Sequence, residues 1–130
     1  MRVSSKELFE GQNLMAENIG RIGEQTASVF LKANGYKIIA MNYHSRFGEI
    51  DIIASDDKYI VFAEVKTRAV NALVSGEEAV DRRKQLKLTT TANRYLQANP
   101  TDLQPRFDVI VIEHSRSRDF RVKNHITNAF

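Results

Sequence analysis

Residues 48–68, GEIDIIASDDKYIVFAEVKTR, constrain the fold of this chain more than any other stretch. They contain two nearly continuous apolar runs around the polar segment Ser55–Lys58, which predicts two strands joined by a turn. Strands this apolar are typical of a sheet that is covered on both faces. Asp51, Glu64 and Lys66 nevertheless stand inside these runs. Charges within buried strands are costly unless they are paired or hold a metal ion, so these three residues need an explanation.

The register of the hairpin decides where the three charges point. With the turn centred after Asp57, Asp51 lies directly opposite Glu64, with roughly 5 Å between their Cβ atoms. Lys66 is two residues beyond Glu64 and therefore projects from the same face. Two carboxylates this close repel each other, and a divalent cation such as Mg²⁺ between them removes the conflict. The alternative is a buried ion pair of Lys66 with one carboxylate, which leaves the other carboxylate unpaired.

A divalent cation at this place would bring hydrolytic chemistry. It would polarise a phosphoryl group and lower the pKa of a bound water molecule. Lys66 would orient that water or stabilise the negative charge that develops during its attack. The position of Lys66 near both carboxylates favours its ammonium form.

The remaining pattern predicts two helices and three further strands. Apolar residues at spacings of three and four predict a helix over 17–34, with Gly35 as its left-handed C-cap, and a second helix over 77–98. The further strands are expected at 36–41, 107–113 and 120–123. With one helix on each face of a mixed five-stranded sheet, the expected fold is a three-layer α/β/α domain. The crossover through the second helix is long enough to make the third and fourth strands parallel.

The length and composition describe an ordinary globular chain. Its 130 residues suit one domain, expected over 15–130 after a loose leader over 1–14, with an irregular connection at 69–77. The absence of cysteine excludes disulfide scaffolds and zinc–thiolate sites. No apolar run is long enough to span a bilayer, and the first residues lack the pattern of a signal peptide. A cytoplasmic location is therefore expected.

Positive charge is concentrated in the second half of the chain. Residues 1–65 carry seven Lys and Arg against nine Asp and Glu, whereas residues 66–130 carry twelve against seven. This asymmetry predicts either a polyanionic partner or a basic, solvated surface. The candidates for contacts to a nucleic-acid backbone are Arg68, Arg83, Lys84 and Lys87.

Two further charged groups have structural interpretations. Arg106 and Asp108 flank Phe107 at the start of a strand, which predicts a structural ion pair rather than a catalytic pair. The last hairpin is basic, and its charges either contact nucleic acid or protect an edge strand. These last charges are Arg116, Arg118, Arg121 and Lys123.

Five segments carry a resemblance to a known family: GRIGEQTASVFLKANGY, MNYHSRFGEIDIIA, VFAEVKTR, GEEAV and RFDVIVI. Together they resemble the YraN family of small bacterial endonuclease-like proteins, from about Asn18 to the C-terminal ITNAF. Within them, Asp51, Glu64 and Lys66 form a D-x(12)-E-V-K pattern that is similar to the core of the PD-(D/E)XK nuclease superfamily. The resemblance implies the restriction-endonuclease-like fold of Holliday-junction resolvases and tRNA-splicing endonucleases.

The resemblance also implies an activity, that of a Mg²⁺- or Mn²⁺-dependent endonuclease (a hydrolase) acting on DNA, with branched or single-stranded DNA as the expected substrate. It assigns Asp51 and Glu64 to the metal, with the Val65 carbonyl as a third ligand. Lys66 becomes the catalytic lysine, and Glu24 is either an auxiliary acid or a solvated helix residue. A homodimer is expected. Two other interpretations stay open: a non-catalytic nucleic-acid-binding module, and an adaptor for a DNA-processing protein.

Overall fold

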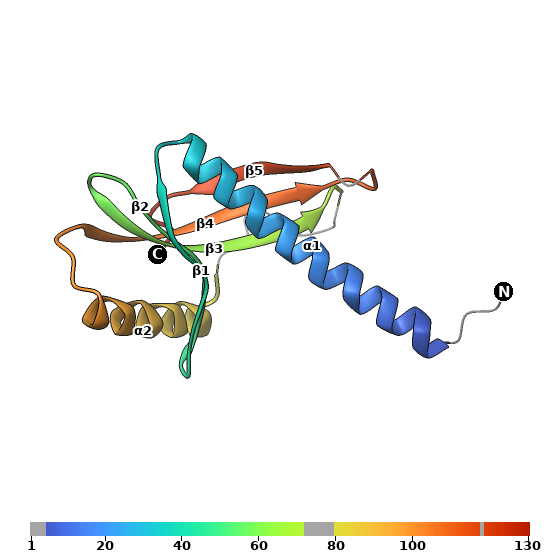
Figure 1. Ribbon diagram of the computed structural model, residues 1–130, viewed down its shortest axis with the longest axis horizontal. Helices are drawn as coiled ribbons and strands as arrows, with labels where there is room; N and C mark the ends of the chain where they lie inside the picture. Colours follow the sequence, from blue (N-terminus) through green and yellow to red (C-terminus); the bar gives the residue numbers. More distant parts are fainter. Residues whose placement is uncertain (1–4, 72–79, 118) are drawn as a thin grey trace.

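The structure, a computed structural model, describes residues 5–71, 80–117 and 119–130, with side chains described from residue 18 onward. Within these ranges the elements follow the predicted order of helix, three strands, helix and two strands (Figure 1). The elements are α1 (Ser5–Ala33), β1 (Lys37–Ser45), β2 (Gly48–Ser55), β3 (Tyr59–Ala69), α2 (Arg82–Ala98), β4 (Gln104–His114) and β5 (Phe120–Ile126).

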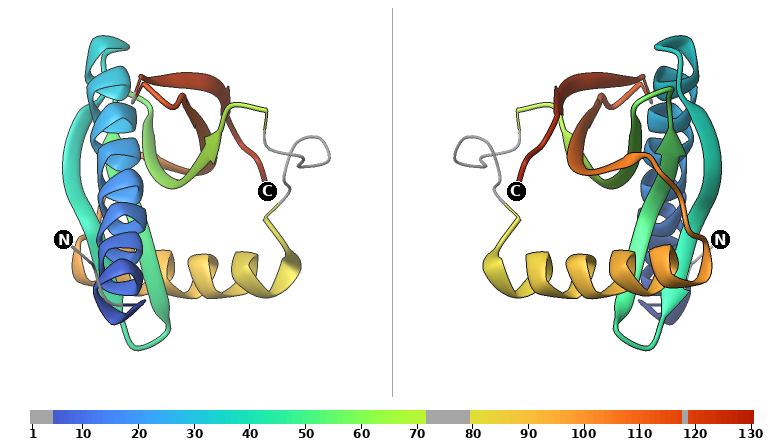
Figure 2. Two further views of the ribbon diagram at one scale, coloured as in Figure 1. Left: turned by 90° about the vertical axis from the view of Figure 1, so that its right-hand side faces the viewer. Right: turned by 90° about the vertical axis from the view of Figure 1, so that its left-hand side faces the viewer.

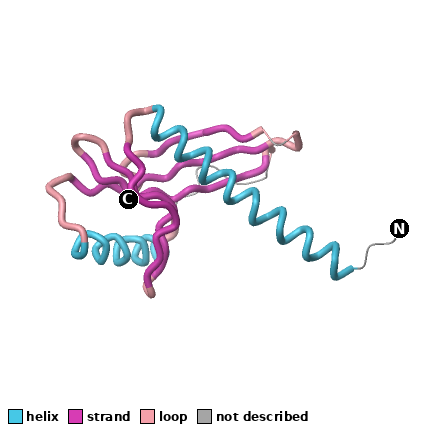
Figure 3. The backbone as a smooth tube through the Cα atoms, viewed as in Figure 1, coloured by secondary structure: helices cyan, strands magenta, loops and turns pink. Residues whose placement is uncertain are grey.

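The five strands form one mixed sheet in the order β1-β2-β3-β4-β5. Neighbouring strands are antiparallel except β3 and β4, which are parallel. The chain passes through α2 between these two strands, as a parallel connection requires. Figures 2 and 3 show α1 running along one side of the sheet and α2 lying on the other. The predicted α/β class and the mixed five-stranded sheet are confirmed, and the arrangement is compatible with a restriction-endonuclease-like fold.

Each side of the sheet has its own apolar core. On the α2 side, Phe62 and Ile53 pack with Leu88 and Tyr95 of the helix. On the α1 side, Ala27 and Leu31 pack with small and β-branched strand residues, namely Ile52, Ala54, Val61, Ala63, Ile110 and Ile112. Because β3 is buried on both faces, its side chains alternate between the two cores, which explains its nearly continuous apolar run.

The limits of the helices differ from the predicted ones. α1 begins at Ser5, inside the expected leader, and its first turns extend beyond the sheet (Figure 1). Residues 5–14 are rich in Lys, Glu, Leu and Gln, which have high helix propensity. Their apolar residues show no clear helical periodicity, so the pattern did not predict this part of the helix. Ile22, predicted on the packed face, is 37% exposed. Gly35 has the predicted left-handed conformation, with φ of 89°.

α2 begins at Arg82 rather than at Glu77, and the start predicted at Glu77 lies outside the described residues, as does most of the expected 69–77 connection. Asp81 caps the helix, because its side chain accepts a hydrogen bond from the Lys84 N–H at 2.9 Å. Val80 is buried in the α2-side core but precedes the helix. Within the described residues, neither helix is long and apolar enough to cross a membrane.

α1 approaches β3 closely at Gly23. A Cβ atom added there would lie 2.0 Å from Oγ1 of Thr67, so only glycine allows this packing. By contrast, a Cβ atom at Gly20, one turn earlier, would meet nothing within 4 Å. Gly23 therefore sets the distance between α1 and the centre of the sheet, and with it the position of the next residue, Glu24.

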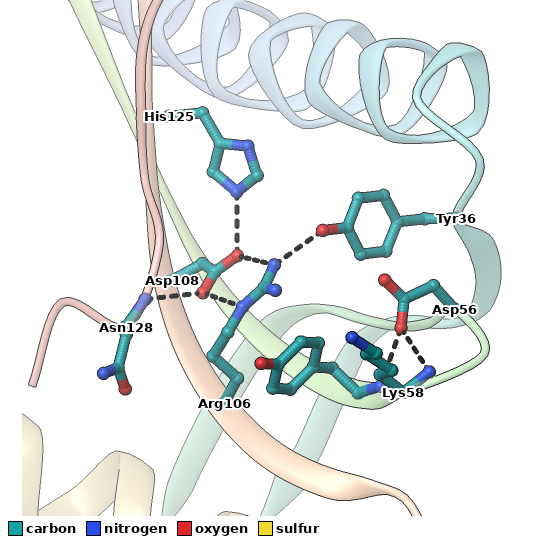
Figure 4. Close-up of polar contacts among 8 residues, drawn as sticks. Tyr36, Asp56, Lys58, Arg106, Asp108, His125 and Asn128 are labelled. Atoms are coloured by element: carbon teal, nitrogen blue, oxygen red, sulfur yellow. Dashed lines mark hydrogen bonds and ion pairs between the residues drawn. The ribbon is translucent and has the colours of Figure 1, made fainter.

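A buried polar cluster joins β4, β5 and the turn after α1 (Figure 4). Asp108 is fully buried and accepts hydrogen bonds from Arg106 at 2.7 and 2.9 Å, from His125 at 2.8 Å and from the Asn128 N–H at 3.1 Å. Arg106 also donates to the Tyr36 hydroxyl at 2.7 Å. The predicted structural ion pair of Arg106 with Asp108 is confirmed, and it fastens the C-terminal segment to the sheet.

Asp108→Asn tests the stabilising role of this cluster. The substitution keeps the shape of the side chain but leaves Arg106 buried without its counter-charge, which costs about 3–5 kcal/mol. We expect a loss of this size in the free energy of unfolding, measured in urea. Glu113→Gln is the control, because Glu113 pairs with the exposed side chains of Arg121 and Lys123. Equal losses for both variants would contradict the assignment.

The same cluster predicts a pH dependence of stability. Burial raises the pKa of Asp108, but the hydrogen bonds from His125 and Arg106 outweigh burial and hold it below its ordinary value. The stabilisation is therefore complete above the unfolded-state pKa of about 3.9 and is lost as the pH falls through the lower native pKa. Below about pH 4, the unfolding free energy of wild type should fall more steeply than that of Asp108→Asn.

Gly23→Ala tests the close approach of α1. We expect a loss of about 1–3 kcal/mol in the free energy of unfolding, because the added methyl group overpacks Thr67. Gly20→Ala is the matched control and should be neutral or stabilising by up to about 1 kcal/mol, since alanine favours the helix. Adding Thr67→Ala to Gly23→Ala should recover part of the loss. A neutral Gly23→Ala variant would show that the contact does not set the helix position.

Candidate active site

β2 and β3 separate at the level of Asp51 and Glu64. Their ladder pairs Ile52 with Ala63, in the register that the sequence predicts. The next step in this register sets Asp51 opposite Glu64, but the ladder ends before it, while β2 stays paired with β1 and β3 with β4. The sheet is thus forked, and the two carboxylates lie where the fork opens.

The Asp51 carboxylate takes over a backbone hydrogen bond at this fork. Its Oδ2 accepts from the Val65 N–H at 2.8 Å, so a side chain replaces the strand that has moved away. Burial and the negative charges of Glu64 and Glu24 together raise the pKa of Asp51 to about 7. The hydrogen bond from the Val65 N–H and the positive charge of Lys84 oppose this shift. A half-buried carboxylate with a raised pKa is one whose negative charge is not fully balanced.

Glu64 is the more deeply buried carboxylate, with 7% of its surface exposed. Its Oε1 is ion-paired with Nζ of Lys84, which reaches it from the first turn of α2. Burial lowers the pKa of Lys84, but the hydrogen bond and the charge of Glu64 outweigh burial. The net effect is a raised pKa, which favours the ammonium form. Lys84 was predicted only as a nucleic-acid contact, and its bond to Glu64 is a finding of the structure.

Lys66 is half-buried on β3, two residues after Glu64 and on the α2 side by alternation. Its pKa is lowered by burial and by the charges of Lys84 and Arg68, which outweigh Glu64 and Asp81. The sequence analysis considered only the effect of the carboxylates, which raises the pKa, whereas burial and the neighbouring cations lower it more. A lowered pKa makes the neutral amine, which can accept a proton, more accessible.

Glu24 lies near the carboxylate pair because α1 packs closely against β3. Burial raises the pKa of Glu24, and the negative charges of Glu49 and Glu64 add to this rise. The hydrogen bond from the Asn42 side chain acts in the opposite direction. Asn42 stands within β1 in the left-handed conformation, with φ of 52°. Asparagine tolerates this conformation better than other residues with a side chain, and such local strain is common at functional sites.

The donor set fits a hard cation with few protein ligands. Asp51 and Glu64 supply carboxylate oxygens, and Mg²⁺ is commonly held by one or two carboxylates with water and phosphate oxygens. Within the ranges that the structure describes, no group of three or more His, Asp or Glu residues is close enough to hold a metal ion. Glu24 lies near the pair, and its charge helps to raise the pKa of Asp51. The Val65 carbonyl stays a predicted ligand, whereas its N–H is bonded to Asp51.

The predicted nucleic-acid contacts surround this site. Arg68 is half-buried on β3, in alternation with Lys66. Arg83, Lys84 and Lys87 are exposed on α2 and line a groove between this helix and the β1–β2 turn. The structure thus brings all four cations to the side of the sheet on which Glu64 lies.

Sequence reasoning missed several parts of this arrangement. Gly23 lies inside a helical pattern, and a glycine at such a position can indicate close packing. The close approach of α1 to β3 could therefore have been predicted from the sequence. Asn42 carries no such signal, because its role depends on a contact between β1 and α1. The groove residues of the β1–β2 turn, Arg46 and Phe47, were likewise treated only as part of a motif.

The comparisons with known proteins agree with the resemblance read from the sequence. The family described as "Uncharacterised protein family UPF0102" matches residues 23–112. A UPF0102 protein of Alkaliphilus oremlandii is 43% identical over 119 residues, which cover 89% of this chain and all of that protein. A UPF0102 protein of Chlorobium phaeobacteroides is 42% identical over 124 residues, which cover 91% of this chain and 98% of that protein. The matched segment contains Glu24 and the fork carboxylates, and the chain belongs to the UPF0102 (YraN) family.

Proposed function

We propose that this chain is a Mg²⁺- or Mn²⁺-dependent endonuclease that hydrolyses phosphodiester bonds in DNA. The observation that carries the proposal is the carboxylate pair at the fork between β2 and β3, the half-buried Asp51 and the buried Glu64, with Lys84 and Lys66 beside them. A sheet that needed only stability would bury apolar residues there, because buried charges are costly even when they are paired.

Each residue at the fork has a distinct proposed role. Asp51 and Glu64 hold the cation, together with the Val65 carbonyl. The bound cation would polarise a phosphoryl group of the substrate and lower the pKa of a bound water molecule. Lys66, whose own pKa is lowered, orients the attacking water or accepts its proton. Glu24 is an auxiliary acid that adds negative charge near the pair.

The substrate and assembly follow from the family resemblance and the charge distribution. Seven of the nineteen Lys and Arg residues lie in residues 1–65 and twelve in residues 66–130, which supports a polyanionic partner such as DNA. Branched or single-stranded DNA is proposed because the family resembles Holliday-junction resolvases. A homodimer, with one site for each strand, is proposed on the same ground. A DNA-processing protein as partner is a separate proposal, in which the chain serves as an adaptor.

A second candidate function is a nucleic-acid-binding module without catalysis. The observation that favours it is the ion pair of Glu64 with Lys84, which already neutralises one of the two carboxylates. In that case the charged residues at the fork serve the fold, and the basic face of α2 does the binding.

Cleavage assays on linear, single-stranded and branched DNA with Mg²⁺ or Mn²⁺ distinguish these two functions. For Asp51→Asn and Glu64→Gln we expect rates lower by on the order of 10²–10³-fold or more, because each variant removes charge stabilisation in the transition state. Lys66→Met should lose about 10²–10⁴-fold, as expected for a group that handles a proton. Asp57→Asn, an exposed change of the same type in the β2–β3 turn, should cut like wild type. Wild-type rates in Asp51→Asn would overturn the site assignment.

Calorimetric titration with Mn²⁺ separates an ion site from an internal ion pair. We expect Glu64→Gln to bind Mn²⁺ more weakly by at least about 10–100-fold. A loss of this size is typical when a residue that only supports a metal ligand is replaced, and a direct ligand should matter no less. The Asp57→Asn protein should bind as wild type does. If Glu64→Gln binds Mn²⁺ with unchanged affinity, Glu64 serves only to pair with Lys84, and the binding module becomes the better proposal.

A further inference from the structure

A groove of about 650 Å³ separates the β1–β2 turn from the first half of α2. One wall is the segment from His44 to Glu49, and the other is formed by Arg83, Lys84 and Lys87 together with Asp81 and Leu88. The β1–β2 turn meets α2 near the middle of the helix, where Gly48 lies against Lys87 and Thr91. Lys84 belongs both to this groove and to the fork, since its Nζ is bonded to Glu64.

The turn that forms one wall is held firmly against α2. The Phe47 N–H donates to Oγ of Ser45 at 3.1 Å, and Ser45 Oγ donates to Oγ1 of the buried Thr91 at 3.4 Å. A Cβ atom on Gly48, whose φ is 154°, would lie 3.2 Å from the same Thr91 oxygen. A larger residue at Gly48 would push the turn away from the helix, so glycine is needed at this contact.

Phe47 holds two arginine side chains at the far end of the groove. The guanidinium carbon of Arg46 lies 4.9 Å from the centre of the Phe47 ring, and that of Arg94 lies 4.8 Å from it. Both distances are those of cation–π contacts, and both arginines are exposed. Phe47 therefore orders two positive charges that come from different parts of the fold, the β1–β2 turn and α2.

The cations of α2 form one stripe along the helix. Lys84, Lys87 and Arg94 are separated by three and seven residues, spacings that return to the same face. At 1.5 Å per residue, the stripe is about 15 Å long. For a stripe parallel to the axis of a B-DNA duplex, this length corresponds to about four base steps, each with a rise of about 3.4 Å.

The acidic residues of the groove are already engaged. Glu49 pairs with His44 at 3.2 Å, and Asp81 accepts the hydrogen bond that caps α2. Within the described part of the chain, no carboxylate is paired with Arg46, Arg83, Lys87 or Arg94. The groove is lined by four cations, Arg46, Arg83, Lys84 and Lys87, against two carboxylates, Glu49 and Asp81, so positive charge is in excess.

We propose that this groove binds the sugar-phosphate backbone of a nucleic acid, with Arg46 and Arg94 as a second anchor, positioned by Phe47, at the end remote from Asp51. The backbone would lie along the α2 stripe and reach the fork at Lys84. Recognition is by charge, because the Phe47 ring already carries two guanidinium groups and is not available for stacking with a base. The groove should therefore have little sequence preference. This inference deepens the proposed function and rests on it for the direction of the bound strand.

Fluorescence anisotropy without divalent metal tests this inference separately from cleavage. The probes are a labelled DNA strand, its duplex and the RNA of the same sequence. We expect Arg46→Gln and Arg94→Gln each to weaken binding by on the order of tenfold, since each loses a bond to a charged group. Each variant should also reduce the slope of log K against log salt by about 1. Phe47→Leu should reproduce part of both effects while its thermal unfolding stays close to that of wild type.

The matched control is Arg121→Gln with Lys123→Gln, two exposed cations on β5 that pair with Glu113 away from the groove. The control should bind within about a factor of two of wild type, because both side chains lie outside the groove and pair with Glu113. Wild-type affinity and slope in the arginine variants, or no binding of any probe, would overturn the inference. If the groove variants weaken binding but no form of the protein cuts DNA, the inference stands and the proposed endonuclease fails. If wild type cuts and the groove variants bind and cut normally, only the inference fails.

Discussion

The separation of β2 from β3 beyond Ile52 and Ala63 is the feature on which the rest of the structure depends. A continuous ladder would satisfy the backbone of both strands and leave no opening in the sheet. At the fork, the Asp51 carboxylate accepts the Val65 N–H instead, so one buried polar group is satisfied by a side chain. On the α2 side of the sheet, Glu64 is paired with Lys84. Backbone pairing, burial and charge are thus coupled at one place.

The buried Asp108 and the half-buried Asp51 show how hydrogen-bond partners determine the pKa of an aspartate inside the fold. Asp108 receives bonds from an arginine, a histidine and a backbone N–H, and its pKa lies below the ordinary value despite complete burial. Asp51 receives one backbone bond and faces other carboxylates, and its pKa is raised to about 7. The first arrangement is complete and stabilises the fold, whereas the second retains an unbalanced charge that can be satisfied by a ligand. This contrast separates the structural cluster of Figure 4 from the candidate active site.

The two helices contribute different residues to the surroundings of the fork. α1 comes close to β3 because Gly23 lacks a side chain, and this approach carries Glu24 toward the carboxylates. α2 packs the opposite core through Leu88 and Tyr95 and turns a stripe of cations toward the β1–β2 turn. One surface of α2 therefore stabilises the sheet, while the other surrounds the site with positive charge.

The sequence by itself determined the α/β class, the mixed sheet, the hairpin register and the pairing of Arg106 with Asp108, because alternation, turn residues and local spacing are encoded over short distances. It did not determine the full extent of α1, since periodicity detects a packed face and not helix propensity. Nor did it determine the Lys84–Glu64 ion pair or the lowered pKa of Lys66, because both depend on charges brought together by the crossover through α2. Only the tertiary structure decided these, since electrostatic interactions follow distance in space and not separation along the chain.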